Sequence, residues 1–264
     1  MLSGLAQLNI ELGNICDKTH LCPMCSHQDK TINPTPFGEM SFELLKDIRA
    51  QIEPGIILSF HRDGEPTAYG RLRDALDLFS GFITSIVTHG GNLARRADEI
   101  IGRCTTVTVS VFRGDKDGRD QLEALRGFLQ IKGERSPQVQ VKIVGDMCAD
   151  GIEEYEALGV PVIRRLIHVG DNSKYAHRSP VAPEVRICLD ALHRPTIGFD
   201  GRVYLCNRFS PQGHGYIGSL HENTLDEIWN GPTRKRMIEA HKAGRRDLAN
   251  PLCATCKHWG TPSA

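Results

Sequence analysis

The chain has 264 residues, with 32 Lys and Arg against 32 Asp and Glu, and its hydrophobic content of 40% is ordinary for a globular protein. The balanced charge produces no overall field that would attract nucleic acid or an anionic membrane, so neither is an expected partner. No apolar run reaches the ~18 residues of a membrane span, and the first residues lack a signal peptide, so we expect a cytoplasmic protein.

Strand-like and helical patterns alternate along the first two thirds of the chain. Runs rich in β-branched residues predict strands over residues 8–12, 55–61, 82–88, 105–112, 139–144 and 160–168. Apolar residues at three- and four-residue spacing predict helices over residues 41–52, 71–79, 93–101, 121–130 and 152–158. Such alternation is typical of βαβ units around a parallel sheet, so we predict an α/β barrel-like unit.

The pattern changes after residue 168. Asp200-Gly201 between two apolar runs predicts a hairpin over residues 196–206, followed by a strand over 216–220 and a helix over 225–243. A unit of roughly 80 residues buries little core alone, so a bound metal is expected to stabilise it. We therefore predict two domains, residues 1–175 and residues 176–264.

Three cysteines, Cys16, Cys22 and Cys25, lie on one loop after the first predicted strand. Disulfides are not expected in the cytosol. Three thiolates can hold three irons of a [4Fe–4S] cluster and leave the fourth iron open to a ligand from outside the protein, which indicates chemistry at the cluster. Zinc is the alternative for this loop, with His20 or His27 as a further ligand.

The last third carries a second group of cysteines, Cys188, Cys206, Cys253 and Cys256. Taken alone, the Cys-x-x-Cys pair that ends this group is typical of zinc. Cys104 and Cys148 stand apart. Cys148 follows the predicted strand 139–144 and should lie at the catalytic end of the barrel, whereas Cys104 precedes a strand. A buried structural role is the alternative for Cys148.

The predicted strands end in small and polar residues, where parallel barrels place their catalytic groups. The second strand is followed by Arg62-Asp63-Gly64-Glu65-Pro66 and the third by Thr88-His89-Gly90-Gly91, while Ser110 lies near the end of the fourth. A glycine at such a place lets the backbone approach a ligand. We expect the turn around Gly64 to bind an α-amino group.

The cysteine trio, the Gly64-Glu65-Pro66 turn and Thr88-His89-Gly90 follow one another as in the radical S-adenosylmethionine (radical SAM) family, which nearly the whole chain resembles. The C-terminal third resembles the SPASM auxiliary-cluster extension in its shorter, "twitch" form. Five residues separate Cys16 from Cys22, where the family usually has three, so the cluster loop must bulge. Met24 stands where the family usually has an aromatic residue. The motifs of the C-terminal resemblance are the hairpin between Cys188 and Cys206, Ile217-Gly218-Ser219-Leu220, Leu225-Asp-Glu-Ile-Trp229 and Cys253-x-x-Cys256.

The resemblance implies a partial (β/α)6 TIM-like barrel and two [4Fe–4S] clusters. The trio Cys16, Cys22 and Cys25 would hold the first cluster, with S-adenosylmethionine on its open iron. The second, auxiliary cluster would have four ligands, Cys188, Cys206, Cys253 and Cys256. The residues implied to contact S-adenosylmethionine are Met24, Asp63, Gly64, Glu65, Thr88 and Ser110.

The resemblance also implies a function. A 5′-deoxyadenosyl radical from S-adenosylmethionine would abstract hydrogen from a small polar substrate, a sugar or aminocyclitol, as in aminoglycoside biosynthesis. The expected reaction oxidises an alcohol to a ketone with the auxiliary cluster as electron acceptor, and an external reductant such as flavodoxin or ferredoxin would reduce the first cluster. Arg62, Asn207 and Arg208 are the substrate-contact candidates.

Two other radical reactions stay open. An epimerase would return hydrogen from a thiol, for which Cys148 is the candidate. A peptide or protein maturase is the other alternative. The predicted barrel begins almost at residue 1, which leaves no room for an N-terminal peptide-recognition domain and favours a small molecule.

Overall fold

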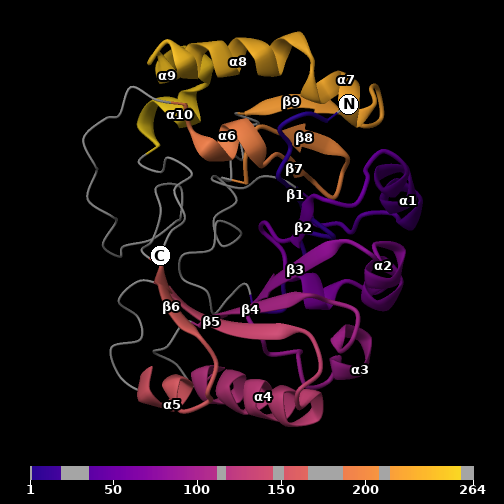
Figure 1. The fold of residues 1–264 in the computed structure, drawn as a ribbon, viewed down its shortest axis with the longest axis vertical. Coiled ribbons are helices and arrows are strands. Elements are labelled where there is room, and N and C mark those ends of the chain that lie inside the picture. The colour runs from indigo at the N-terminus through magenta and orange to yellow at the C-terminus, as the bar shows by residue number, and fades with distance from the viewer. Residues whose placement is uncertain are drawn as a thin grey trace.

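A nine-stranded sheet runs through the protein in the computed structural model (Figure 1), which describes residues 2–18, 36–111, 117–144, 152–165, 187–207 and 215–256. Its strand order is β6-β5-β4-β3-β2-β1-β7-β8-β9. The strands are β1 (Gln7–Ile10), β2 (Ile57–Phe60), β3 (Ile83–Thr88), β4 (Thr106–Val111), β5 (Gln138–Val144), β6 (Val162–Arg165), β7 (Thr196–Ile197), β8 (Arg202–Tyr204) and β9 (Tyr216–Ser219).

Strands β1 to β6 pair in parallel and in chain order, as expected for successive βαβ units. Figure 1 shows their helices along the outer side of the curved sheet. Leu45 and Ile48 of the first helix and Leu8 of β1 are fully buried in the core between these layers. The helices are α1 (Phe42–Ala50), α2 (Leu72–Leu78), α3 (Ala97–Ile100), α4 (Asp117–Lys132) and α5 (Ile152–Glu156), with a 3-10 turn η3 (Pro66–Ala68) after β2. The predicted α/β class is confirmed.

The C-terminal part extends the same sheet. Strand β7 pairs in parallel with β1, with Asn9 opposite Thr196, and β8 and β9 continue it antiparallel. Trp229 donates through Nε1 to the Ser3 carbonyl at 3.0 Å, so the two parts of the chain are also joined by side chains. The helices here are α6 (Leu189–His193), α7 (Leu225–Trp229), α8 (Pro232–Lys242), α9 (Arg246–Ala249) and α10 (Pro251–Thr255).

The prediction of one helix over residues 225–243 is wrong, because the structure divides it into α7 and α8. Asn230 ends α7, Gly231 is the N-cap of α8 and Pro232 is its first residue. Proline lacks the N–H needed to continue α7 but fits the first turn of a new helix. The predicted domain boundary at residue 175 lies outside the described residues.

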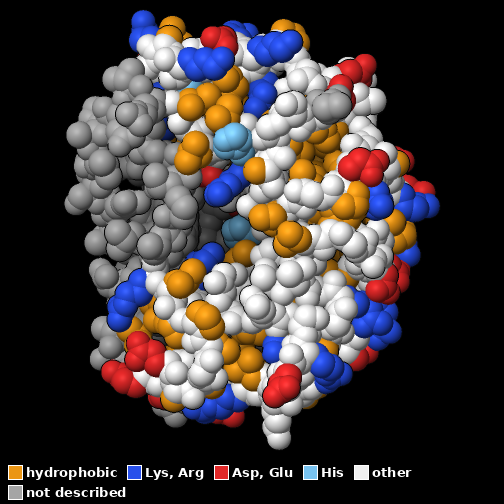
Figure 2. Space-filling view, viewed as in Figure 1, with side chains coloured by type: hydrophobic (Ala, Val, Ile, Leu, Met, Phe, Trp, Pro, Cys, Tyr) orange, Lys and Arg blue, Asp and Glu red, His pale blue; other side chains and the backbone are white. Residues whose placement is uncertain are grey.

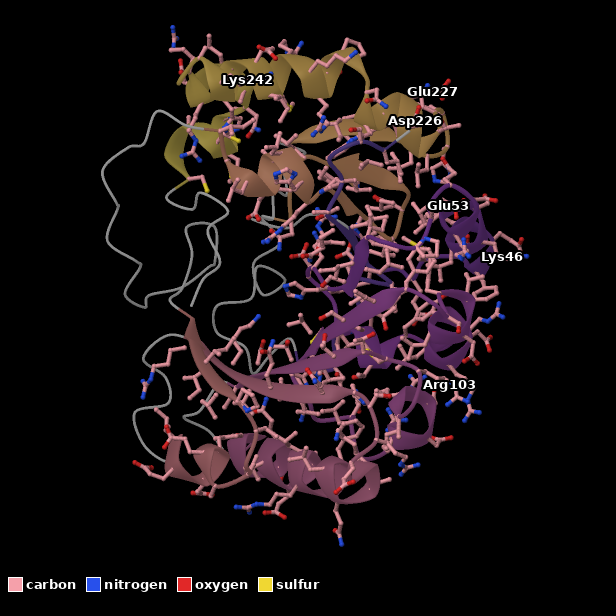
Figure 3. All side chains as sticks on the ribbon, in the orientation of Figure 1. Lys46, Glu53, Arg103, Asp226, Glu227 and Lys242 are labelled. Atoms are coloured by element: carbon pink, nitrogen blue, oxygen red, sulfur yellow. The ribbon has the colours of Figure 1, made fainter. Side chains whose placement is uncertain are left out.

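Charged side chains mark the outer surface of this fold. Figure 3 shows Lys46, Arg103 and Lys242 pointing away from the sheet. Within the described ranges, no helix is long and apolar enough to cross a membrane.

Candidate functional site

Gly64 packs directly against the segment that leads from β1 to Cys16. A Cβ placed on Gly64 would lie 1.9 Å from the Gly13 carbonyl oxygen and 2.7 Å from the Asn14 Cα. Glu65 donates its backbone N–H to the Ile15 carbonyl at 2.9 Å. The turn after β2 therefore supports the cluster loop by close backbone contact, which only glycine permits at this position.

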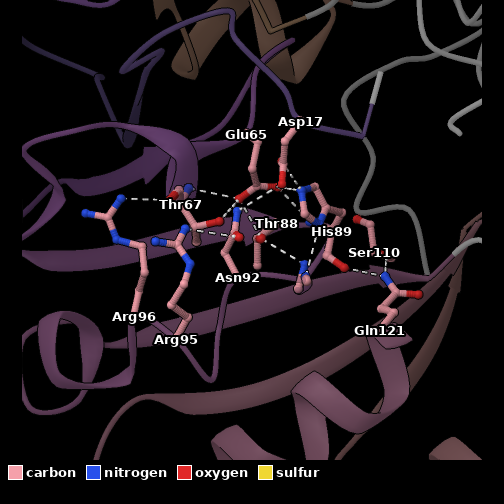
Figure 4. A network of polar contacts seen from close by, with 12 residues as sticks. Asp17, Glu65, Thr67, Thr88, His89, Asn92, Arg95, Arg96, Ser110 and Gln121 are labelled. Carbon is pink, nitrogen blue, oxygen red and sulfur yellow. Dashed lines mark hydrogen bonds and ion pairs between the residues drawn. The ribbon is translucent and has the colours of Figure 1, made fainter. Parts of the chain in front are cut away.

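The Glu65 carboxylate joins the ends of β2 and β3 (Figure 4). Its Oε1 accepts the Thr67 N–H at 2.9 Å, the Thr67 hydroxyl at 2.6 Å and the Thr88 hydroxyl at 2.6 Å. Its Oε2 accepts the His89 backbone N–H at 2.9 Å. Glu65 is 4% exposed and Thr88 2% exposed, so these bonds are shielded from water. Both predicted site residues meet here, and their polar atoms bind the protein itself.

Gln121 of α4 fixes the next two strand ends, as Figure 4 also shows. Its amide nitrogen donates to the Ser110 carbonyl at 2.8 Å and to the His89 carbonyl. Tyr155 donates its hydroxyl to the Gln121 side-chain oxygen at 3.5 Å. Ser110 is half-buried at the end of β4, as predicted. This helix residue thus sets the spacing of β3 and β4 at the site.

Cys16 lies beside Asp17 and His89, with the ligand atoms of all three within 4.8 Å of one another. His89 Nε2 lies 2.8 Å from Asp17 Oδ1, and its Nδ1 accepts the Gly91 N–H at 3.0 Å. This arrangement assigns the proton of the neutral ring to Nε2.

The two partners of this pair titrate away from their usual ranges. The hydrogen bond from His89 lowers the pKa of Asp17 to about 2. Burial alone would lower the pKa of His89, but the charges of Glu65 and Asp17 raise it above its usual value. The site therefore holds an anionic carboxylate and a basic imidazole next to Cys16.

Arg62 joins the barrel to the C-terminal hairpin. Its Nη1 lies 3.3 Å from Glu11 Oε2, its Nε 3.6 Å from Asp63 Oδ2, and its guanidinium stacks 4.3 Å from the Tyr204 ring centroid. Burial alone would lower the pKa of Arg62, but the negative charges of Glu11 and Asp63 raise it above its usual value. The Arg62 side chain is only 7% exposed, so nearly all of it is buried in this joint.

Glu11 is the centre of the joint. It also accepts the Asp63 N–H at 3.2 Å and the Phe199 N–H at 3.4 Å, so one carboxylate binds β1, β2 and the hairpin of β7 and β8. Asp63, a predicted cofactor residue, is held through both its backbone and its side chain. A buried carboxylate with several donors resists displacement, because any donor left unpaired would cost free energy.

The predicted auxiliary ligands are described and free of disulfides: Cys188, Cys206, Cys253 and Cys256. Burial, together with a smaller contribution from the neighbouring thiols of Cys188 and Cys256, raises the pKa of Cys253 to about 11. Burial likewise raises the pKa of Cys188. These thiols are close enough to repel one another as thiolates. That donor set fits an iron–sulfur cluster, whose iron cations would compensate the charge.

Several predicted residues lie outside the described ranges, namely Cys22, Met24, Cys25, Cys148 and Arg208. Asn207 is described; its side-chain oxygen is buried and has no hydrogen-bond partner among the described residues. Cys104 lies before β4, as predicted, where burial raises its thiol pKa to about 11.

Sequence reasoning missed three polar residues at the site, Glu11, Asp17 and Gln121, and named His89 only as part of a motif. The three missed residues bind partners that lie 188, 72 and 32 residues away along the chain, respectively. One sequence signal could have found Glu11 and Asp17: they are acidic residues at the end of the first strand and at the start of the cysteine loop.

The surface view in Figure 2 shows histidine and basic side chains around a hollow near the middle of the face that is turned to the viewer.

Comparison with solved structures gives the fold. BtrN in complex with AdoMet and 2-DOIA is 16% identical and has a TM-score of 0.63, with 96% of this chain and 92% of that chain covered. Native anSMEcpe with bound AdoMet and Cp18Cys peptide is 13% identical, covers 90% and 83%, and has a TM-score of 0.61. Streptococcus suis SuiB bound to precursor peptide SuiA is 13% identical, covers 96% and 70%, and has a TM-score of 0.55.

A known family model matches the C-terminal part of the chain. Residues 188–257 match the model described as "SPASM: Iron-sulfur cluster-binding domain". The C-terminal part is thus similar to SPASM iron–sulfur cluster-binding domains, and the chain as a whole shares the fold of structures that contain AdoMet. The predicted resemblance is thereby confirmed, and the four described cysteines from Cys188 to Cys256 all fall within the matched residues. No curated protein sequence matches the chain.

Proposed function

We propose that this protein is a radical SAM enzyme with two [4Fe–4S] clusters that oxidises an alcohol of a small polar substrate. The observation that supports this best is the position of Cys16. It follows β1 beside the Gly64–Glu65 turn of β2 and His89 of β3, where a parallel barrel places its chemistry. The match of residues 188–257 to an iron–sulfur cluster-binding domain supports the second cluster.

Cys16, Cys22 and Cys25 would hold the first cluster, and S-adenosylmethionine would bind its open iron. Together these groups would supply one-electron cleavage of the sulfonium and radical abstraction of hydrogen. Asp63 and Gly64 would offer backbone atoms to the bound S-adenosylmethionine, while Met24 and Ser110 would contact its remaining parts.

Glu65 and Thr88 would act differently. All four hydrogen bonds of the Glu65 carboxylate go to the protein, and the Thr88 hydroxyl donates to Glu65 and accepts the Gly90 N–H at 2.9 Å. We assign both residues to positioning: they hold the ends of β2 and β3 in register, next to the residues that would hold the cofactor. A site prearranged in this way loses little free energy when the ligand binds.

Oxidation of an alcohol requires removal of one hydrogen atom, one proton and one electron from the substrate. The hydrogen atom would pass to the radical, the proton to a base, and the electron to the auxiliary cluster. Four thiolates, from Cys188, Cys206, Cys253 and Cys256, leave that cluster no open iron, which suits an electron acceptor. Two of the substrate candidates are described, Arg62 and Asn207. We favour Asn207, which is next to Cys206 and has a buried amide oxygen, because Arg62 pairs with Glu11 and Asp63.

A small-molecule substrate is supported by the fold shared with BtrN, whose structure contains 2-DOIA. Modification of a peptide is the second candidate, because the structures of anSMEcpe and SuiB with the same fold contain peptides. An external reductant such as flavodoxin or ferredoxin would supply the electron for the first cluster in either case.

Iron and sulfide analysis after anaerobic purification tests the two clusters. We expect about eight irons and eight sulfides per chain, as two [4Fe–4S] clusters require. The C16S/C22S/C25S variant should lose half of both and stop cleaving S-adenosylmethionine. The C253S/C256S variant should lose the other half and still cleave it. Zinc without sulfide would contradict the proposal.

Formation of 5′-deoxyadenosine tests the substrate. An aminocyclitol or sugar alcohol should accelerate it and give a ketone, whereas acceleration by peptides alone would favour the second candidate. Epimerisation would instead incorporate deuterium from heavy water at the reacting carbon. In that case C148A should abolish turnover and C104A, which removes a thiol before β4, should not.

A further inference from the structure

Asn250 makes two hydrogen bonds to one auxiliary ligand. It is the N-cap of α10, with extended backbone angles of φ −168° and ψ 163°, and Pro251 follows it. Its side-chain oxygen accepts the backbone N–H of Cys253 at 3.0 Å, as N-cap residues commonly do. Its amide nitrogen donates to the Cys253 Sγ, also at 3.0 Å. The cap alone requires only the first of these bonds.

The surroundings of Asn250 hold this amide in place. The residue is 8% exposed, so water does not compete for its donors. A Cβ built on Gly215 would lie 4.0 Å from the Asn250 amide nitrogen, and the Gly215 carbonyl accepts the Leu205 N–H at 2.7 Å. Leu205 precedes Cys206. Asn250 therefore binds the segment that carries Cys253 and lies near the segment that leads from Cys206.

A donor aimed at a thiolate ligand affects the cluster that the thiolate holds. The N–H dipole stabilises negative charge on sulfur, and the reduced cluster places more charge there than the oxidised one. Hydrogen bonds to sulfur are accordingly among the groups that set cluster potentials, and outer residues orient the ligands themselves. Removing such a donor should make the cluster harder to reduce.

We propose that Asn250 is a positioning residue of the auxiliary cluster, which orients the Cys253 thiolate and raises the reduction potential of the cluster through its N–H···S hydrogen bond. This inference rests on the auxiliary cluster of the proposed function. A higher potential would make the cluster a better acceptor for the electron of the substrate radical.

Two variants remove the amide N–H donor and keep a side-chain oxygen as helix cap. N250S adds no charge and has a shorter hydroxyl side chain, and N250D adds one negative charge and no donor. Both should retain the auxiliary iron, because Ser and Asp are good N-caps. In the C16S/C22S/C25S background, which isolates this cluster, redox titration followed by electron paramagnetic resonance should give lower midpoint potentials in both. We expect roughly a tenfold change in the oxidised-to-reduced ratio at fixed potential, about 59 mV for a one-electron couple.

N230S is the matched control. Asn230 is likewise a helix-cap residue, the C-cap of α7, but its amide nitrogen donates to two oxygens of Asp226, both at 3.1 Å. The midpoint potential of the auxiliary cluster in N230S should equal that of the parent. Unchanged potentials in N250S and N250D, or a shift in N250D alone, would overturn the inference while the auxiliary cluster stays established. A parent protein without auxiliary iron and sulfide would instead overturn the proposed function and this inference together.

Discussion

The barrel site and the auxiliary site are prepared in opposite ways. Around Glu65, carboxylates, hydroxyls and backbone N–H groups pair with one another, so this network is complete without a ligand. In the auxiliary site, the thiols of Cys188 and Cys253 are buried and their pKa values are raised. The first site supplies geometry to a ligand, whereas the second holds groups that only a metal cluster would stabilise as thiolates.

Two histidines, one at each site, show the same contrast. The charges of Glu65 and Asp17 outweigh burial and raise the pKa of His89. His241 of α8 is fully buried, and neither of its ring nitrogens has a hydrogen-bond partner among the described residues. Burial, with the charge of Arg246, lowers its pKa to about 4. The pKa of a histidine shielded from water thus rises or falls according to the partners that its neighbours provide.

The largest expected effect comes from G64A, which attacks the backbone contact of the barrel site. The added methyl would meet the Gly13 carbonyl at 1.9 Å and displace the segment that leads to Cys16. Because a shift of 1 Å in a site can cost about a hundredfold in rate, we expect that loss in cleavage of S-adenosylmethionine. The rate of 5′-deoxyadenosine formation measures it.

The control is G127A in α4, where a Cβ would make an ordinary contact with the Ala94 Cβ at 3.5 Å. It should keep full activity and gain up to about 1 kcal/mol of helix stability. Equal loss in both variants would show that the close approach at Gly64 is unimportant.

E65Q tests whether the network is as complete as the structure shows. An amide group has one acceptor oxygen, so its NH₂ would face a donor such as the Thr88 hydroxyl or the His89 N–H. We expect a loss of about 2–3 kcal/mol in the free energy of unfolding, by anaerobic denaturation. E43Q, which removes a surface ion pair with Lys46 at an exposed position, should cost less than about 1 kcal/mol. If E65Q lost as little stability as E43Q, the Glu65 network would not contribute to stability as we expect.

His241 predicts a pH dependence on the auxiliary side. Its pKa is lowered from 6.5 to about 4 in the folded protein, so the unfolded chain binds the proton more tightly. The stability from neutral His241 is therefore complete above pH 6.5 and is lost as the pH falls toward 4. Between pH 7 and pH 5 we expect a loss on the order of 1–2 kcal/mol from this residue.

Denaturation of the parent and of H241L at pH 7 and at pH 5 measures how much unfolding free energy is lost through His241. H241L should have a smaller difference between pH 7 and pH 5, and H221Q, at an exposed position, should behave like the parent. The same difference in H241L as in the parent would exclude His241 as the source.

R62K gives the smallest expected effect and tests the joint between the two sites. Lysine keeps the charge near Glu11 but loses the planar stack on Tyr204 and part of the hydrogen bonding. We expect a loss of about 1 kcal/mol in stability with an unchanged KM for the substrate. A raised KM without loss of stability would restore Arg62 as a substrate contact.

Much of the fold could be predicted from the sequence because its signals are local. β-branched runs and three- and four-residue apolar spacing placed β1 to β6 and α1 to α5 within a few residues. The short helices α6, α9 and α10 have too few residues to show a period and were missed. The end of α7 and the start of α8 were also missed. Pro232 indicated a new helix there, but the apolar spacing continued across it and predicted one helix.

The sequence by itself determined the α/β class, the two cysteine groups and the motifs that resemble radical SAM and SPASM proteins, because residue type and spacing carry that information. Only the tertiary structure decided what the motif residues touch. Gly64 packs on Gly13, Glu65 binds the protein at every oxygen, and Asn250 reaches Cys253 Sγ. These contacts depend on how strands and helices stack, and a pattern along one chain does not specify which side chains that stacking brings together.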